Sequence, residues 1–365
     1  MSAILVRPDL HHQFGARNPQ FCLVVDSANK YGIGMDGQSS LYHRTSQIAL
    51  HPGESLETFL ATRAPREADI LVVTPGTFLS SPGASVIGED RKLSVVPCAS
   101  TPVTAAQLSY FLEICESIDH DSVAARSDAI LEALNLAESV RIVDARRGTS
   151  ASFGSLGDYD WNVQAGVLSG GEQQIAPNGE LSAVPLDIMH FDAERRLDLC
   201  GQIAMSGTVI VHRGGNESDE DEQARLYARL AAATHGDAVV LDIDHGRIVG
   251  VRPHGPEAKP AVEALEELFQ ADSRYQIVWE FGLGLNDGIK PVGGNCGLNE
   301  VCGGRGAQLH IGIGLTPWTK FALTFHCADS LVQVGEAVLA EPLRRSMTRR
   351  RGPACGCDEG ARGVW

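Results

Sequence analysis

The glycine-rich segment from residue 279 to residue 329 carries the side chains whose types and spacing are best suited to chemistry. Its acidic and imidazole groups lie in motifs that read WEFGLG, LNEVCGG, LHIGIG and TFHCAD. Carboxylates and imidazoles set among small residues are the ligands that a hard or borderline divalent metal ion requires. The sequence therefore predicts a metalloenzyme, and the candidate metal ligands are Glu280, His310, His326 and Asp329.

Two of these motifs have the period of a β-strand, in which residues two positions apart face the same side. In LHIGIG the side chain of His310 shares a face with both glycines, and in WEFGLG the side chain of Glu280 does the same. Because glycine has no side chain, we expect open space beside each ligand. Two such strands would form a cleft for a metal ion and a substrate.

A third motif, FALTFH, predicts a strand that ends at His326. Asp329 is three residues further on, so a regular strand would point its carboxylate to the opposite side. A bulge or turn at Cys327 or Ala328 is needed to bring both groups to one metal ion.

Two further carboxylates are candidate catalytic residues, as a general base or as a bridging ligand. Glu172 follows a Gly-Gly turn, which allows a close approach to a ligand, and Glu300 lies near several glycines. The other histidines have no partner at ligand spacing. We expect surface or structural roles for His11, His12, His43, His51, His190, His212, His235, His245 and His254.

The first 148 residues alternate apolar strands with helical patterns, which is typical of a doubly wound parallel sheet. Thr104 and Gln107 have the spacing of a capping box at the start of one helix, and a second helical pattern follows it. Short continuous apolar runs predict buried strands at 21–26, 69–75, 93–98 and 140–146.

The composition changes near residue 148, where a segment rich in Gly, Ser and Asp indicates a domain boundary. Short strands with glycine-rich turns follow, and DIDHGRIV predicts a hairpin with a His-Gly turn. We therefore expect an α/β fold in three parts: an N-terminal doubly wound parallel-sheet domain (1–148), a mixed or antiparallel α+β metal-site domain (149–342) and a mobile tail (343–365).

Charge and composition exclude several classes of function. The formal net charge of -16 repels phosphate backbones and anionic lipid surfaces, so we expect neither nucleic acid nor a membrane as a partner. The chain has no membrane-spanning apolar run and no signal-peptide core at its start, which favours a cytoplasmic location. Nine scattered cysteines are typical of free thiols. A GxGxxG string at Gly32 precedes no helical pattern, so we predict no nucleotide cofactor.

The order of the motifs resembles the thermophilic-type leucyl aminopeptidase family of metallopeptidases and its shorter relatives, which include the 2,5-dihydroxypyridine 5,6-dioxygenases. The similarity covers nearly the whole chain and is most specific at the HIGIG strand and at the GxG strand after Glu280. A GGE-like turn ending at Glu172 and a DxxxGxIVGV-type hairpin also match. The last motif, from His326 to Asp329, is one residue longer than the family's His-x-Asp.

The resemblance implies a metal-dependent, aminopeptidase-like hydrolase that acts on an amide or small peptide. In the peptidases, the positions that match Glu172, Glu280, His310 and His326 with the following aspartate surround two metal ions. Carboxylate-rich ligation favours Zn, Mn or Co. The alternatives are a mononuclear Fe(II) ring-cleaving dioxygenase for a dihydroxylated heteroaromatic, and a non-catalytic relative that has lost the metal. The peptidases also imply a homodimer.

Overall fold

The computed structural model describes residues 3–37, 39–185, 195–214, 220–304, 306–316 and 318–342. Within these residues, helices accompany both parallel and antiparallel sheets, which confirms the expected α/β class. None of the described helices is long and apolar enough to cross a membrane. The predicted tail (343–365) and His190 lie outside the described residues.

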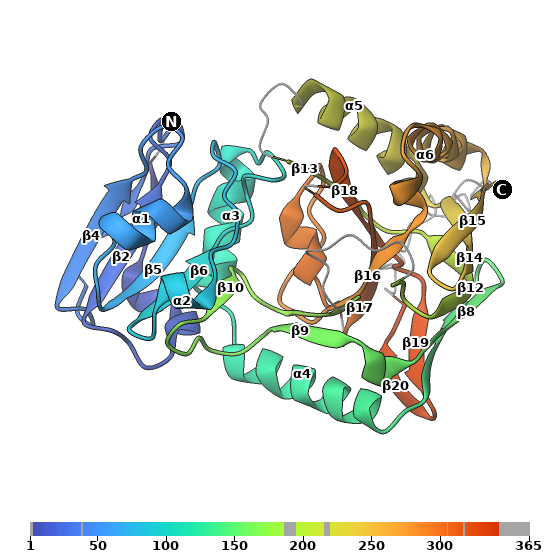
Figure 1. Ribbon diagram of the computed structural model, residues 1–365, viewed down its shortest axis with the longest axis horizontal. Helices are drawn as coiled ribbons and strands as arrows, with labels where there is room; N and C mark the ends of the chain where they lie inside the picture. The colour runs from blue at the N-terminus through green and yellow to red at the C-terminus, as the bar shows by residue number, and fades with distance from the viewer. Residues whose placement is uncertain are drawn as a thin grey trace, which may run out of the picture.

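A five-stranded parallel sheet forms the N-terminal part of the molecule, on the left of Figure 1. Its strand order is β10-β6-β5-β2-β4, and all of its pairs are parallel. Three of its strands were predicted from their apolar runs, and two were not. The predicted strands are β2 (Gln20–Val25), β5 (Ala68–Val73) and β6 (Arg91–Val95), and the edge strands are β4 (Arg44–Ala49) and β10 (Gln173–Ile175).

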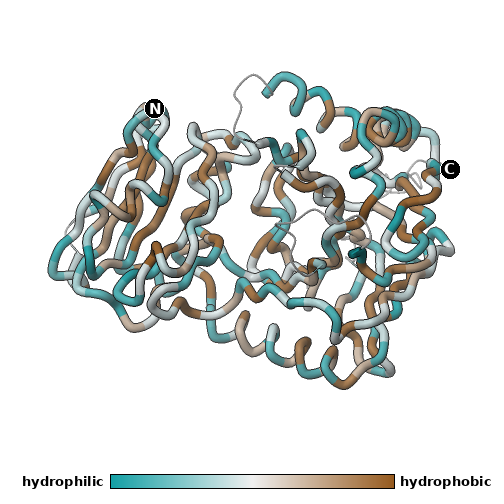
Figure 2. Tube along the Cα trace, in the orientation of Figure 1, coloured by the Kyte–Doolittle hydropathy of each residue, from teal (hydrophilic) through white to brown (hydrophobic). Residues whose placement is uncertain are grey.

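Helices cover both faces of this sheet, which explains why its central strands are apolar throughout, as Figure 2 shows. The helices α1 (Leu56–Thr62) and α2 (Ala84–Ile87) pack on one face, and α3 (Ala105–Cys115) packs on the other. The predicted capping box at Thr104 begins α3. A small parallel pair, β1 (Ile4–Val6) and β3 (Ile33–Met35), contributes to the core beneath α3.

The strand predicted at 140–146 does not belong to the parallel sheet. This strand, β7 (Ser139–Asp144), pairs antiparallel with β8 (Thr149–Gly154) and with β19 (Leu331–Val334). Two features explain the correction. The β7–β8 connection is too short for the crossover that parallel pairing requires. The burial of β7 also alternates along the strand, as in a sheet with one face covered.

The seven strands of this antiparallel sheet run in the order β15-β14-β12-β8-β7-β19-β20. The predicted hairpin joins β14 to β15, and His245 and Gly246 adopt φ values of 44° and 72°, as a tight primed turn requires. The strands cross the domain boundary predicted near residue 148. The strand β7 precedes residue 148 but pairs in the antiparallel sheet, and β10 follows residue 148 but pairs in the parallel sheet. The strands not yet given are β12 (Leu199–Met205), β14 (Ala238–Asp244), β15 (Arg247–His254) and β20 (Ala337–Ala340).

A second antiparallel sheet carries the motifs that predict the metal site. Its six strands run in the order β13-β18-β17-β16-β11-β9 and lie in the middle of the molecule in Figure 1. The strands are β9 (Asp160–Gln164), β11 (Glu180–Val184), β13 (Val209–Arg213), β16 (Val278–Gly284), β17 (Gln308–Ile313) and β18 (Phe321–His326).

The two faces of this six-stranded sheet have different surroundings. One face packs against the seven-stranded sheet, where the ring centroids of Phe281 and Phe153 lie 4.8 Å apart. The other face is covered by the 3-10 helix η8 (Gly297–Val301), because the backbone of Cys302 lies directly over Gly284. The hydrophobic core of the two antiparallel sheets also includes residues of three helices, α4 (His120–Asn135), α5 (Glu220–Ala231) and α6 (Lys259–Ala271).

Candidate metal centre

The face of the six-stranded sheet beneath η8 brings together residues that are far apart in the sequence. His310 on β17 lies opposite Gly282 on β16 and opposite His326 on β18. Glu280 on β16 lies opposite Gly312 on β17. Because directly opposite residues of antiparallel strands point to the same face, Glu280, His310 and His326 share one face, as their spacing predicts.

Three side chains on this face form a cluster that can hold a metal ion. One ligand atom from each of Glu180, Glu280 and His310 lies within 4.8 Å of the other two. The Nε2 of His310 is 3.6 Å from Oε1 of Glu180, an ion-pair distance that is too long for a strong hydrogen bond. The adjacent strands β11, β16 and β17 contribute one ligand each.

The condition of His310 tests whether this cluster fits a divalent cation. Its side chain is fully buried, and neither ring nitrogen has a hydrogen-bond partner among the described residues. A buried polar group without a partner costs roughly 1–3 kcal/mol of folding free energy, and an ion bound to one of the two ring nitrogens would offset this cost. An imidazole beside two carboxylates is also a common donor set for borderline divalent ions. The residues therefore fit a divalent metal.

The glycines of the two motifs do not leave the open cleft that we expected. A Cβ at Gly282 would collide with the imidazole of His310, and one at Gly312 would lie 2.9 Å from Cβ of Glu280. The strands are paired so that each glycine lies opposite a ligand, and the ligand's side chain fills the space above it. The glycines therefore make room for the ligands themselves.

Glu300 borders the cluster and is held there by its own contacts. The hydroxyl of Thr324 donates a hydrogen bond to Oε1 of Glu300 at 3.0 Å, and Nε2 of His212 lies 3.8 Å from the same oxygen. Glu300 and His212 keep 18% and 16% of their side chains exposed, and Glu280 is also only partly buried, so the cluster is not closed to solvent.

His326 borders the cluster with one ring nitrogen bonded and one unbonded. Its Nδ1 lies 3.1 Å from the carbonyl oxygen of Thr208 and 2.9 Å from the hydroxyl of the same residue. When Nδ1 donates its proton to the carbonyl, Nε2 is the nitrogen that can accept one. The Nε2 atom has no hydrogen-bond partner among the described residues. The ring centroids of His326 and His310 are 5.6 Å apart.

Burial and neighbouring charges move the pKa values of Glu280 and Glu300 in opposite directions. Burial, together with the charge of Glu180, raises the pKa of Glu280 to about 8. Burial also favours the neutral form of Glu300, but its contacts with His212 outweigh this and lower the pKa to about 2. Of these two carboxylates, Glu300 is therefore the one that is ionised at neutral pH.

The pKa values of the two imidazoles, His310 and His326, also move in opposite directions. Burial disfavours the charged form of His310, but its contact with Glu180 and the charge of Glu280 outweigh burial and raise the pKa to about 9. Burial and the charge of His310 lower the pKa of His326 to about 4. Without a bound ion, the positive charge of the pair therefore resides on His310 at neutral pH, and a metal ion would replace that proton.

Asp329 lies away from the cluster, which corrects its prediction as a metal ligand. Its carboxylate pairs with the guanidinium of Arg147 at 2.7 Å, and Arg147 is buried beside Asp144. The chain turns after β18, with the backbone N–H of Ser330 bonded to the carbonyl of Cys327, instead of forming the bulge that His326 and Asp329 would need to share an ion. The longer final motif thus serves the β7–β8 turn.

Glu172 also lies elsewhere. It is exposed in the turn before β10, at the edge of the parallel sheet, and its carboxylate accepts a hydrogen bond from the backbone N–H of Ser169 at 2.7 Å. The Gly-Gly turn approaches the backbone of Glu89 closely. The signal that suggested a ligand contact therefore reflects a close approach of two backbone segments.

Glu180 was not predicted from the sequence, and His212 was expected to have a surface or structural role. Glu180 begins β11 and lies opposite Gly284, and Ser182 lies opposite Gly282 on the same face. The alternation of a carboxylate with a small residue was the available signal, because it matches the pattern around Glu280. His212 lies on β13 among apolar residues, and no pattern in the sequence distinguishes it.

Fold and site together define a mixed α/β protein with a candidate metal centre on an antiparallel sheet. The crocagin biosynthetic protein CgnE/B family matches residues 54–317, and the chain belongs to this family. The matched segment includes Glu180, Glu280 and His310. No curated protein matches the chain.

Two solved structures are similar to the chain in fold. The 2,5-dihydroxypyridine dioxygenase from Pseudomonas putida KT2440 is 13% identical, with a TM-score of 0.54 over 91% of this chain and 92% of that chain. Wild-type AmpT from Thermus thermophilus is 12% identical, with a TM-score of 0.45 over 90% and 92%. At this identity the first likeness concerns the fold alone.

Proposed function

We propose that this protein is a metal-dependent hydrolase that acts on an amide bond of a small molecule or short peptide. The observation that carries the proposal is the convergence of Glu180, Glu280 and His310, whose ligand atoms lie within 4.8 Å of one another. Neither ring nitrogen of the buried His310 has a hydrogen-bond partner among the described residues, and a bound metal ion would supply one. These three residues would hold one divalent ion, with Zn, Mn or Co as the fitting elements.

The neighbouring residues have roles that follow from their contacts. A bound divalent ion polarises a carbonyl group and lowers the pKa of bound water from about 15.7 toward about 7. Glu300, fixed by Thr324, would orient a water molecule or the substrate amide as a hydrogen-bond acceptor. His326, whose Nδ1 is bonded to Thr208, would accept a proton at Nε2. This role replaces the one that the sequence suggested for Glu172.

Access to the cluster favours a small substrate. His310 and His326 are almost completely buried, and Glu280, Glu300 and His212 are each only partly exposed. A bulky substrate would require the segment that contains η8 to move. A short aminoacyl amide or a compact amide is therefore the substrate class to test first.

The test compares the metal content and amide hydrolysis of the wild type with those of two variants. We expect stoichiometric metal in the wild type and loss of metal and activity by roughly 100-fold or more in His310→Ala. Glu172→Ala is the matched control, because Glu172 is exposed and distant from the cluster, and it should keep both properties. Metal retained in His310→Ala, or metal-loaded wild type without amidase activity, would contradict the proposal.

A mononuclear Fe(II) dioxygenase is the second candidate, and one observation favours it. The unbonded Nε2 of His326, opposite His310, offers a second imidazole, so His310, His326 and Glu280 could supply two nitrogens and one carboxylate. Iron content after anaerobic purification and oxygen uptake with a dihydroxylated heteroaromatic would separate this candidate from a hydrolase. Absence of both metal and turnover would indicate a non-catalytic relative.

A further inference from the structure

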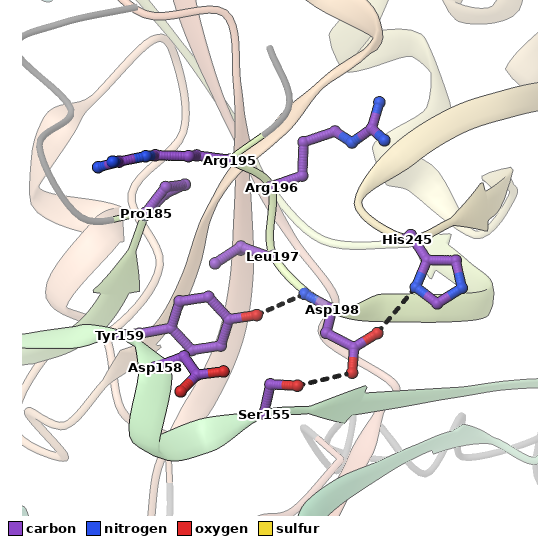
Figure 3. A pocket seen from close by; sticks show the side chains of 9 residues that line it. All are labelled: Ser155, Asp158, Tyr159, Pro185, Arg195, Arg196, Leu197, Asp198 and His245. Carbon is purple, nitrogen blue, oxygen red and sulfur yellow. Dashed lines mark hydrogen bonds and ion pairs between the residues drawn. The ribbon is translucent and has the colours of Figure 1, made fainter. Parts of the chain in front are cut away.

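A second group of metal-ligating side chains lies at a pocket that the proposed function does not use. The pocket has a volume of about 510 Å³ and is lined by the segment after β8, by residues 195–198 and by the β14–β15 turn (Figure 3). Asp198 and His245 line it, and Cys200 lies at the start of β12 beside them. Cys200 is on β12 of the seven-stranded sheet, Asp198 directly precedes β12, and His245 is in the β14–β15 turn of the same sheet.

The three side chains are already spaced like the ligands of a single ion. One ligand atom from each of Asp198, Cys200 and His245 lies within 4.8 Å of the other two. Oδ1 of Asp198 is 2.9 Å from Nδ1 of His245, as Figure 3 shows. Ligand atoms around a tetrahedral zinc lie about 3 to 4 Å apart, because each bond measures about 2.0 to 2.3 Å. Small side-chain rotations would therefore suffice to coordinate an ion.

Asp198 is held in place by contacts outside the group. The hydroxyl of Ser155 donates a hydrogen bond to Oδ2 of Asp198 at 3.0 Å, and the backbone N–H of Asp198 donates one to the hydroxyl of Tyr159 at 2.7 Å. Gly154 permits this placement, because a Cβ there would lie 2.6 Å from Oδ2. Hydrogen bonds of this kind orient the ligands of metal sites.

His245 is held by the backbone of its turn. Its φ of 44° is a left-handed conformation that a non-glycine residue rarely adopts, and surrounding contacts must support it. The backbone N–H of Gly246 donates a hydrogen bond to the carbonyl of Leu199 at 2.9 Å. The backbone N–H of His245 also lies 3.3 Å from Sγ of Cys200. The turn thus places the imidazole next to both partners.

We propose that Asp198, Cys200 and His245 form a second divalent-cation site, which takes Zn²⁺ or a similar borderline ion. A carboxylate, a thiolate and an imidazole supply three ligands and leave one position open, as in zinc sites that accept water or a substrate. Binding displaces the thiol proton of Cys200 to solvent and needs no other reactant. Water or an anion such as a carboxylate is the exogenous ligand that the open position of such a site would take.

The experiment is a titration of the full-length apoprotein with Co²⁺, followed by absorption spectroscopy. A thiolate bound to Co²⁺ gives a charge-transfer band that carboxylate and imidazole ligands do not give. The Glu180 cluster contains no cysteine, so the band reports only on a cysteine-containing site. Cys355 and Cys357 lie in the sequence beyond residue 342, so the titration uses a Cys355→Ser/Cys357→Ser background.

We expect Co²⁺ to produce the band in this background as the site fills, and one equivalent to suffice when the Glu180 cluster is removed by Glu280→Gln/His310→Ala. Cys200→Ser should abolish the band. His245→Ala should weaken Co²⁺ binding by roughly 10-fold or more, and Ser155→Ala should weaken it less. The side chain of His245 is 68% exposed, so its variant should fold normally. Glu280→Gln/His310→Ala should retain the band, which makes this result independent of the proposed function.

Two results would overturn the proposal. One is the absence of a thiolate band in the Cys355→Ser/Cys357→Ser background. The other is a band that survives in Cys200→Ser, which would assign the signal to another cysteine. His43→Ala, which changes an exposed histidine outside the group, controls for nonspecific loss of binding and should behave as the background does.

Discussion

The Glu180 cluster is enclosed by the sheet that carries it, whereas the Asp198 cluster borders an open pocket. In the first, Glu180 and His310 are 6% and 0% exposed. In the second, the side chains of Asp198 and His245 are 37% and 68% exposed. Both offer carboxylate and imidazole ligands, and they differ in burial and in the thiol that Cys200 adds to the second cluster. Changes to the enclosed cluster should affect folding and metal binding together, and changes to the open one should affect binding alone.

The largest effect is expected for Gly282→Ala, because the new Cβ would occupy the place of the His310 imidazole. Overpacking of a buried site costs about 1–3 kcal/mol of unfolding free energy, and displacing His310 should abolish metal binding in the enclosed cluster. Urea denaturation and metal analysis measure the two effects. Gly157→Ala is the matched control, since nothing lies within 4 Å of its Cβ, and it should alter neither quantity. A fully stable, metal-binding Gly282→Ala would break the comparison.

Asp329→Asn should lower stability without affecting the metal. The substitution removes one of the two carboxylates that pair with the buried Arg147 and leaves Asp144 as its remaining partner. We expect a loss of about 1–3 kcal/mol in unfolding free energy. Metal content should match that of the wild type, because Asp329 lies outside the cluster. A variant of normal stability that no longer binds metal would restore Asp329 as a ligand.

Glu280→Gln should have opposite effects on stability and on metal binding. The substitution removes one of two neighbouring carboxylates in a buried site, where burial and the charge of Glu180 raise the pKa of Glu280. In the presence of a chelator, the variant should therefore be more stable than the wild type by about 1 kcal/mol or more. Added metal should stabilise the wild type alone. Thermal denaturation with and without chelator measures both, and destabilisation of the chelated variant would argue against charge repulsion.

Burial should also govern a histidine in the parallel-sheet part, where no metal is involved. Burial and the charge of His120 lower the pKa of His11 from 6.5 to about 3. The unfolded chain therefore binds the proton first, and unfolding free energy falls as pH drops from about 6.5 toward 3, by at most about 1.4 kcal/mol per pH unit.

His11→Phe should reduce this loss of stability in acid. The ring of His11 already lies 6.1 Å from that of Phe21, so an aromatic replacement suits the site. Urea denaturation of both proteins at pH 7.5 and at pH 5 measures the difference. Equal losses of stability on acidification in the two proteins would show that His11 contributes nothing to the pH dependence.

Several elements were predictable from the sequence because local rules determine them. The central strands of the parallel sheet are continuous apolar runs, the capping box begins α3, and the His-Gly turn forms the predicted hairpin. That Glu280 shares a face with Gly282, and His310 with Gly312, also followed from the period of a strand. Each of these features depends on neighbours within one element or one turn.

The remaining features depend on pairing between distant segments, which a single sequence does not specify. The strand β7 resembles a buried parallel strand in composition, but its partners are β8 and β19. Register decides that His310 fills the space above Gly282. Glu180 joins the cluster only because β11 pairs with β16, and Asp329 leaves it because Arg147 offers a buried cation.

Anomalous diffraction from crystals of the Mn²⁺-loaded or Zn²⁺-loaded protein is the most direct test of the central claim. We predict a peak within about 2.0 to 2.3 Å of ligand atoms from Glu180, Glu280 and His310. If protein that hydrolyses amides is loaded with metal and crystallised, and no ion is found at these three residues, the proposed metal centre is wrong.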